Sequence, residues 1–151
     1  REKQKVKRIY GLSESQFRNL FDGVSRETGV KGTNLLIALE TRLDNIVYRL
    51  GFASSRKAAR QLIGHGHVEV NGKRVDIPSF RVLPGQEIRV APSSRELVSV
   101  HMAQEYASRG QPVSWLNIDT EKASGRLLER PTREAIPINA QEQLIVELYS
   151  K

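Results

Sequence analysis

The chain has 151 residues, of which 24 are Lys or Arg and 17 are Asp or Glu, so its formal net charge is +7 and its pI is about 10.0. This length is enough for one ordinary domain or two small ones, and the basic excess favours a polyanionic partner, nucleic acid first and an anionic membrane surface second. The absence of Cys excludes disulfides and thiolate chemistry, and because no apolar run is long enough to span a membrane and no signal-peptide pattern occurs, we expect a cytosolic protein.

The first forty residues predict helices. Residues 1–9 form a charged stretch without helix breakers. Ser13-Glu14-Ser15-Gln16 matches a capping box, and apolar residues follow at helical spacing, which predicts a helix over residues 13–28. After two glycines, residues 34–40 predict another short apolar helix.

Two further helices each carry an apolar and a polar face. In the first, which ends at Gly51, the inward positions are Leu43, Ile46, Val47 and Leu50 and the outward positions are Arg42, Asn45 and Arg49. Ser54-Ser55 caps the second, whose inward positions are Ala58, Ala59, Leu62 and Ile63 and whose outward positions are Arg56, Lys57, Arg60 and Gln61.

A small sheet is expected next. Residues 67–76 alternate apolar and polar side chains around Asn71-Gly72, the strongest short-range signal of a β-hairpin. A turn at Pro84-Gly85 precedes a third strand over residues 87–90. Together with the two preceding helices, these strands predict a compact unit of two helices and three strands.

The remaining residues predict two helices and a second hairpin. A helix is expected over residues 95–108, and a hairpin joins residues 115–119 to 126–129 around Ser124-Gly125, anchored by Trp115. Asn139 is a suitable cap for a last helix with an apolar face made of Leu144, Ile145, Leu148 and Tyr149. Because this helix is too short to be stable alone, we expect it to pack on the first helices.

The basic excess lies in two blocks. Residues 1–20 hold six basic and two acidic side chains, and residues 42–90 hold nine and four. Residues 21–41 hold two and three, and residues 91–151 hold seven and eight. Two concentrated blocks indicate an electrostatic footprint assembled from separate segments, although plain solubility remains the alternative.

These motifs carry a resemblance to a known family. Arg42-Leu43-Asp44-Asn45, the run from Ser55 to Leu62 and Val68-Glu69-Val70-Asn71-Gly72 resemble the RNA-binding module named after ribosomal protein S-four. The opening residues 1–11 and the closing Leu-Ile-Val-Glu-Leu-Tyr-Ser-Lys extend this resemblance to the bacterial S-four family over essentially the whole chain. It implies an α+β fold in which residues 1–41 and 126–151 form a helical domain and residues 42–125 an inserted RNA-binding domain.

The resemblance also implies a function. Members of this family are structural constituents of the small ribosomal subunit that bind its 16S-type RNA early, at a multi-helix junction, nucleate assembly and contribute to translational accuracy with ribosomal protein S-five. Binding to messenger RNA for autoregulation is a further partner it suggests. Because the sequence begins with Arg1, we expect a segment upstream, and the zinc-binding cysteines that some members carry there are not assigned to residues 1–151.

The expected RNA contacts follow the two basic blocks, with Arg and Lys on phosphates and polar side chains fixing orientation. They are Lys3, Lys5, Lys7, Arg8, Tyr10, Arg18, Arg42, Asn45, Arg49, Ser55, Arg56, Lys57, Arg60, Gln61, His65, His67, Asn71, Lys73, Arg74, Ser79 and Arg81.

Several of these residues have alternative interpretations. The helix with Arg56 and Arg60 is also consistent with a solvated face. His65 and His67 are a conceivable metal or acid–base pair, but no third ligand has a recognisable spacing, so RNA contact, capping or packing fits them better. Tyr10 is the aromatic residue expected to stack on bases, whereas Phe17 and Phe21 are expected in the core.

Two competing functions are an RNA-modifying enzyme and a stand-alone RNA-binding module, since related modules occur in both. An enzyme would need a further catalytic domain. The chain shows neither a Gly-rich cofactor loop nor a nucleophile motif, so we expect no enzyme activity, no cofactor, no metal and no small-molecule substrate. The resemblance of the segments outside residues 40–91 argues against a stand-alone module.

Overall fold

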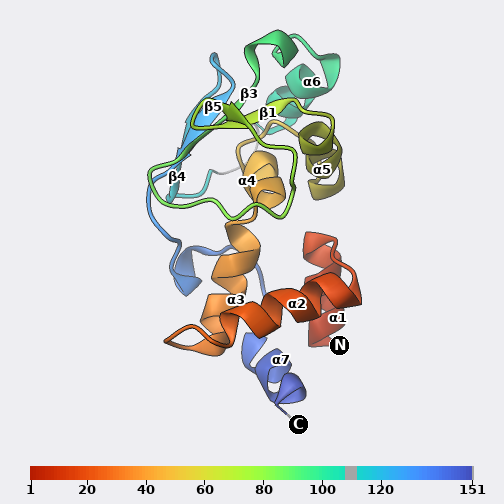
Figure 1. Ribbon diagram of the computed structural model, residues 1–151, viewed down its shortest axis with the longest axis vertical. Coiled ribbons are helices and arrows are strands. Elements are labelled where there is room, and N and C mark those ends of the chain that lie inside the picture. Colours follow the sequence, from red (N-terminus) through yellow and green to blue (C-terminus); the bar gives the residue numbers. More distant parts are fainter. Residues whose placement is uncertain (108–111, 151) are drawn as a thin grey trace. The chain divides into compact units, whose positions relative to one another are not determined.

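The computed structural model in Figure 1 describes residues 1–107 and 112–150, which divide into two compact units. Unit 1 consists of Arg1–Glu40 and Pro131–Lys151, and unit 2 consists of Thr41–Arg130. The described residues contain helices and a small antiparallel sheet, so the α+β prediction is confirmed. The predicted division into a helical domain of residues 1–41 and 126–151 and an inserted RNA-binding domain of residues 42–125 stays a prediction.

Unit 1 is built from four α-helices: α1 (Glu2–Tyr10), α2 (Glu14–Val24), α3 (Lys31–Glu40) and α7 (Glu142–Tyr149). The predicted capping box is confirmed, because Ser13 Oγ accepts from the Gln16 amide at 3.2 Å while the Gln16 side chain accepts from the Ser13 amide at 2.9 Å. The helix ends at Val24 rather than at residue 28, in a turn where the Ser25 hydroxyl donates to the Asp22 carbonyl.

The core of unit 1 surrounds α3, which is buried along most of its length. Phe17 and Phe21 lie in this core, as predicted, and α7 packs against α3 and α1. The predicted apolar face of α7 was partly wrong. Ile145 is buried, but Leu144 and Leu148 are each 48% exposed, and the neighbouring Val146 is buried in their place.

The start of α7 also differs from the prediction, because Gln141 rather than Asn139 occupies its N-cap position. The guanidinium of Arg133 organises the segment before this helix. It donates to the carbonyls of Ile138 and Ala140 and pairs with Glu142 at 2.7 Å. The carbonyls before α7 are therefore hydrogen-bonded by Arg133, a residue of the one-turn 3₁₀ helix Arg133–Ala135. A search for local capping residues does not reveal this contact.

Unit 2 contains the predicted helix pair and sheet. Helices α4 (Leu43–Arg49) and α5 (Arg56–Gly64) pack together beside the sheet. The strands are β1 (Val68–Val70), β2 (Lys73–Arg74), β3 (Glu87–Val90), β4 (Leu116–Asp119) and β5 (Ser124–Leu127), paired antiparallel in the order β2-β1-β3-β5-β4. Asn71 and Gly72 have φ of 50° and 80°, as a two-residue hairpin turn requires.

The second hairpin exists, but its predicted turn is wrong. Gly125 lies inside β5, opposite Ile88 and Ile118, and the turn comes before Ser124. A Cβ on Gly125 would lie 2.3 Å from Leu50 Cδ2 and 2.7 Å from the Asn117 carbonyl oxygen. This glycine therefore permits close packing of α4 on the sheet rather than a turn.

Between β3 and β4 the chain forms a 3₁₀ turn (Pro92–Ser94) and α6 (Val98–Ala107). The predicted helix began at residue 95, within the turn that precedes α6, and its predicted last residue, Ser108, lies outside the described residues. Trp115 is 1% exposed, in agreement with its predicted anchoring role. In the described ranges, the helices are all too short or too polar to cross a bilayer.

Candidate nucleic-acid interface

Helix α5 presents a polar face opposite its core face. The helix begins at Ser55, whose hydroxyl accepts from the Ala58 amide at 3.0 Å. Ala59, Leu62 and Ile63 are buried, and the opposite face consists of Arg56, Lys57, Arg60 and Gln61. Lys57 and Gln61 are exposed, whereas the two arginines are half-buried, so their guanidiniums have protein neighbours on one side.

Those neighbours come from α4, where the prediction of an outward polar face is wrong for Arg42 and Asn45. Arg42 is 7% exposed and Asn45 is fully buried. Arg42 donates to both carboxylate oxygens of Asp44, at 3.1 and 3.0 Å. Asn45 Oδ1 accepts from Arg56 Nε at 2.8 Å. The polar face of α4 is therefore covered by α5 and by its own ion pair rather than by solvent.

The same contacts orient the α5 arginines. The guanidinium of Arg56 lies over the Tyr48 ring, 4.6 Å from its centroid. Arg60 Nη1 lies 3.4 Å from Asp44 Oδ2. Arg49, the third residue of the predicted outward face, is half-buried. Sequence reasoning missed Asp44 and Tyr48 as functional candidates. The signal that was available is the position of Asp44, an acidic residue directly before Asn45 of the predicted polar face.

The β1–β2 hairpin adds exposed cations beside the end of α5. Lys73 and Arg74 are exposed, and Asn71 anchors the turn because its amide donates to the Glu87 carbonyl and its Oδ1 accepts from the Glu87 amide, both at 2.8 Å. A Cβ on Gly66 would lie 3.4 Å from Arg74 Cδ. The arginine side chain therefore lies along the turn that follows α5.

That turn carries the two histidines. His65 is exposed, while His67 is half-buried with its Nδ1 at 2.7 Å from Ser94 Oγ, and the two rings lie edge to face at 6.3 Å. Among the described residues, His, Cys, Asp and Glu do not gather in groups of three or more that would suit a metal ion.

A fixed loop adds Ser79 and Arg81. The first amides of α4 lack helical partners, and here Leu43 donates to the Phe80 carbonyl at 2.8 Å and Asp44 to the Pro78 carbonyl at 3.1 Å. Ser79, between these two carbonyls, is exposed, and Arg81 forms an isolated β-bridge with Arg42. The backbone thus holds this loop against the start of α4.

We use the name α5 surface for the predicted contacts on these elements of unit 2. It comprises the polar residues of α5, the turn after it, the β1–β2 hairpin and the 78–81 loop: Ser55, Arg56, Lys57, Arg60, Gln61, His65, His67, Asn71, Lys73, Arg74, Ser79 and Arg81.

Unit 1 carries its own basic residues on α1 and α2, several of them in ion pairs. Lys7 and Lys3 lie 2.9 and 3.1 Å from Glu14 Oε1, and their hydrogen bonds lower the pKa of that carboxyl to about 2. Lys5 lies 3.8 Å from Glu2. Two further predicted contacts are Arg8, which is exposed, and Arg18, which lies 5.5 Å from the centre of the Tyr149 ring.

Tyr10 was predicted to stack on bases, and the structure contradicts this. The residue is 1% exposed, and its hydroxyl donates to Glu40 Oε2 at 2.5 Å. A buried phenol with a carboxylate partner is part of the core of unit 1, because a buried hydroxyl must be hydrogen-bonded. The partner lies in α3, which residue spacing around Tyr10 does not reveal.

Comparison with known proteins now identifies the family. Residues 1–40 match the family model described as "Ribosomal protein S4/S9 N-terminal domain", and residues 41–88 match the "S4 domain". Proteins named small ribosomal subunit protein uS4 from Thermus thermophilus, Acidobacterium capsulatum and Syntrophomonas wolfei are each 54% identical to the chain, over all of it and 72% of their own length. The chain belongs to the uS4 family. The resemblance found in its motifs is confirmed.

The two uS4 family matches meet where the structure divides, because one ends at residue 40 and the other begins at 41, the first residue of unit 2. The S4-domain match ends within β3. It therefore includes α4, α5, the β1–β2 hairpin and the 78–81 loop, which carry the α5 surface. Strands β4 and β5 and helix α6 lie beyond the matched residues.

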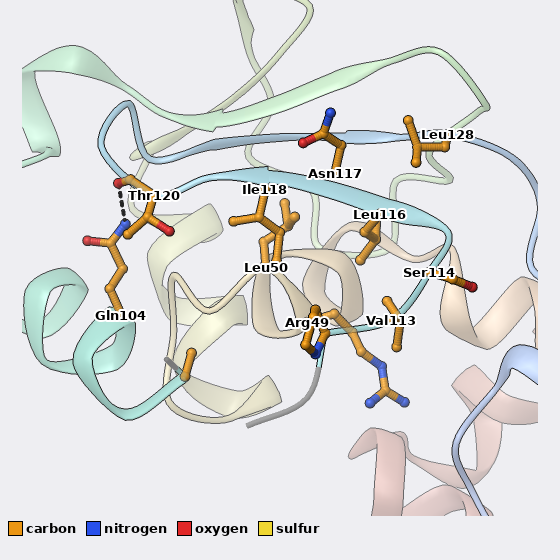
Figure 2. A pocket seen from close by; sticks show the side chains of 12 residues that line it. Arg49, Leu50, Gln104, Val113, Ser114, Leu116, Asn117, Ile118, Thr120 and Leu128 are labelled. Atoms are coloured by element: carbon orange, nitrogen blue, oxygen red, sulfur yellow. Dashed lines mark hydrogen bonds between the residues drawn. The ribbon is translucent and has the colours of Figure 1, made fainter. Parts of the chain in front are cut away.

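One cavity of unit 2 shares none of its lining residues with the α5 surface (Figure 2). It has a volume of about 570 Å³ and is bounded by residues of α4, α6 and β4. Leu50, Leu116 and Ile118 line it, and Gln104 Nε2 donates to the Thr120 carbonyl at 3.0 Å. Among the described residues that line it, most are apolar and Arg49 is the one charged residue, so these residues bring together no acid, base and nucleophile.

Proposed function

We propose that this chain is a structural constituent of the small ribosomal subunit and binds the subunit's 16S-type ribosomal RNA through the α5 surface. The observation that carries the proposal is that Arg56 and Arg60 of α5 are held in place by α4, while Arg74 of the β1–β2 hairpin lies along the turn that follows α5. The relatives' names, small ribosomal subunit protein, support the ribosomal assignment.

The binding mechanism is electrostatic and geometric. Lys57, Lys73 and Arg74 are exposed and suited to neutralise phosphates and release counterions. Arg56 and Arg60 present oriented guanidiniums, whose planar donors match phosphate oxygens. Gln61, Ser79 and His65 supply hydrogen bonds that fix orientation. Such a surface recognises the shape of folded RNA more than base identity.

Unit 1 is proposed to contribute further contacts through Lys3, Lys5, Lys7, Arg8 and Arg18. The two lysines beside Glu14 are partly neutralised within the chain, so we assign them a smaller share than Arg8, which is exposed. Of the predicted α4 residues, Arg42 and Asn45 act from within the protein, and half-buried Arg49 stays a candidate contact.

Finer roles rest on the family resemblance. We propose early binding at a multi-helix junction, nucleation of subunit assembly, contact with ribosomal protein S-five, a contribution to translational accuracy and regulatory binding to messenger RNA. The cellular location would be the cytoplasm, on the ribosome. The protein would act without catalysis, as the ribosomal-protein names of its relatives suggest. The match of residues 1–40 to a ribosomal N-terminal domain favours this role over a stand-alone RNA-binding module.

Binding to a folded small-subunit RNA fragment at increasing salt tests the proposal. If about four phosphates are neutralised, affinity should fall by about 100-fold between 50 and 200 mM salt. Replacing Arg56 and Arg60 together by Ala should weaken binding by at least about 10-fold and make the salt slope less steep by about two.

The control is Lys122→Ala with Arg130→Ala, which removes the same charge from exposed positions of unit 2 outside the α5 surface. It should retain nearly the parental affinity. Salt-independent binding would contradict the RNA assignment, and equal effects of the two double variants would contradict the assignment of the α5 surface.

A further inference from the structure

We infer that Asn45 and Tyr48 of α4 are positioning residues that clamp Arg56, and that this clamp lets the α5 surface distinguish folded RNA from a flexible polyanion. Asn45 accepts from Arg56 Nε at 2.8 Å, and the Tyr48 ring lies 4.6 Å from the centre of the same guanidinium. The inference rests on the proposed RNA-binding function and adds how one of its arginines acquires a defined geometry.

The clamp controls both orientation and position of the guanidinium. The hydrogen bond at Nε sets the direction of the planar group within its own plane. The ring contact sets the plane itself, because a guanidinium stacks on an aromatic face. An arginine held by both contacts has lost most of its rotational freedom before RNA arrives.

This preorganisation matters for binding because a free arginine side chain has high rotamer entropy, which it loses when it is ordered. When RNA binds a mobile arginine, the side chain has to be ordered, and this reduces the affinity. Folding has already ordered a preorganised arginine, so RNA binding does not carry this cost. Folded RNA presents phosphates at fixed positions, so a fixed guanidinium raises its binding affinity. A flexible single strand adjusts the positions of its own phosphates, so a fixed guanidinium changes its affinity little.

The burial of Asn45 supports a positioning role. Its side chain is fully buried, so it acts on the surface only through what it holds, and Arg56 is the first residue of α5. A polar side chain at such a site needs hydrogen-bond partners, and the Nε of Arg56 is one of them. Helix α4 thereby fixes the residue at which the basic helix begins.

The test uses variants that leave the charge of the α5 surface unchanged. Tyr48→Leu removes the ring face, and Tyr48→Phe is its matched control, which keeps that face. Asn45→Ala removes the acceptor, and Arg56→Lys keeps the charge but loses the planar fork. Each is measured by Kd for a folded small-subunit RNA fragment and for single-stranded poly-uridine, with the salt slope of both.

We expect Tyr48→Leu and Asn45→Ala each to weaken binding to folded RNA by about 3- to 10-fold. The salt slope and the poly-uridine affinity should stay at parental values, because no phosphate contact is removed. Tyr48→Phe should bind as the parent does. In the Arg56→Lys background, Asn45→Ala should have no further effect, because the partner through which it acts is gone.

Several results would overturn the inference while leaving the proposed function intact. One is parental affinity of Tyr48→Leu for folded RNA when Arg56→Lys is weakened. Another is an equal loss for folded RNA and poly-uridine, and a third is parental affinity of Arg56→Lys itself. If Asn45→Ala does not fold, the comparison of Tyr48→Leu with Tyr48→Phe, at a half-buried position, tests the inference by itself. A parent chain that does not bind folded RNA would instead refute the proposed function.

Discussion

Replacing Asp44 by Ala tests the buried ion pair that organises α4. The Asp44 side chain is 2% exposed and pairs with the Arg42 side chain, which is 8% exposed. Removing one partner of a buried pair leaves the other charge uncompensated and typically costs about 3 to 5 kcal/mol. Arg60, whose side chain is 28% exposed, adds at most about 1 kcal/mol because solvent screens its contact.

Trp115 supplies the assay, because it is the single Trp of the sequence and lies buried in unit 2. In urea unfolding followed by Trp fluorescence, Asp44→Ala should lower the midpoint by about 2 M for a domain of this size. Asp76→Ala, at an exposed position, should change the free energy of unfolding by no more than about 0.5 kcal/mol.

A double variant separates the charge from the packing. Arg42→Met with Asp44→Leu replaces both charges by apolar side chains, and we expect it to recover most of the stability lost by Asp44→Ala. If Asp44→Ala and Asp76→Ala unfold at the same urea concentration, the buried pair does not stabilise unit 2 and the reasoning fails.

Two further predictions concern packing and pH. Gly125→Ala should destabilise unit 2 by about 1 to 3 kcal/mol, because the new Cβ meets Leu50 and a strand carbonyl, while Gly64→Ala, with open space, should be neutral or stabilising; equal urea midpoints would contradict this. The pKa of Glu14 is lowered to about 2, so the stability of unit 1, followed by its helical signal, should fall as pH falls from about 4.5 toward 2. Burial raises the pKa of Tyr149 to about 12, so the stability should also fall as pH rises from 10 to 12. Glu14→Gln should abolish the first pH dependence and Tyr149→Phe the second.

Local patterns predicted the elements of the fold that depend on neighbouring residues. The capping box at Ser13 and the Asn71-Gly72 hairpin are stabilised by backbone conformations and hydrogen bonds within a few residues, so the sequence alone was sufficient for them. The core face of α5 also followed from helical spacing.

Contacts between distant residues were beyond these patterns. Helical spacing placed Asn45 opposite the apolar stripe of α4, but it does not show that Arg56 of the next helix covers that side. Tyr10 likewise meets Glu40, thirty positions away in sequence. Ser124-Gly125 looked like a turn because glycine serves turns and close packing alike, and only the approach of Leu50 distinguishes the two.

Co-sedimentation measures whether the chain joins the small ribosomal subunit through the α5 surface. A tagged copy of the chain is expressed in bacterial cells, and the lysate is separated on a sucrose gradient at physiological salt. We predict that the parent chain and the Lys122→Ala, Arg130→Ala control sediment with small subunits, while the Arg56→Ala, Arg60→Ala variant shifts toward the top of the gradient although it remains folded. A parent chain found only at the top, or a folded Arg56→Ala, Arg60→Ala variant that sediments with small subunits as the parent does, would contradict the account.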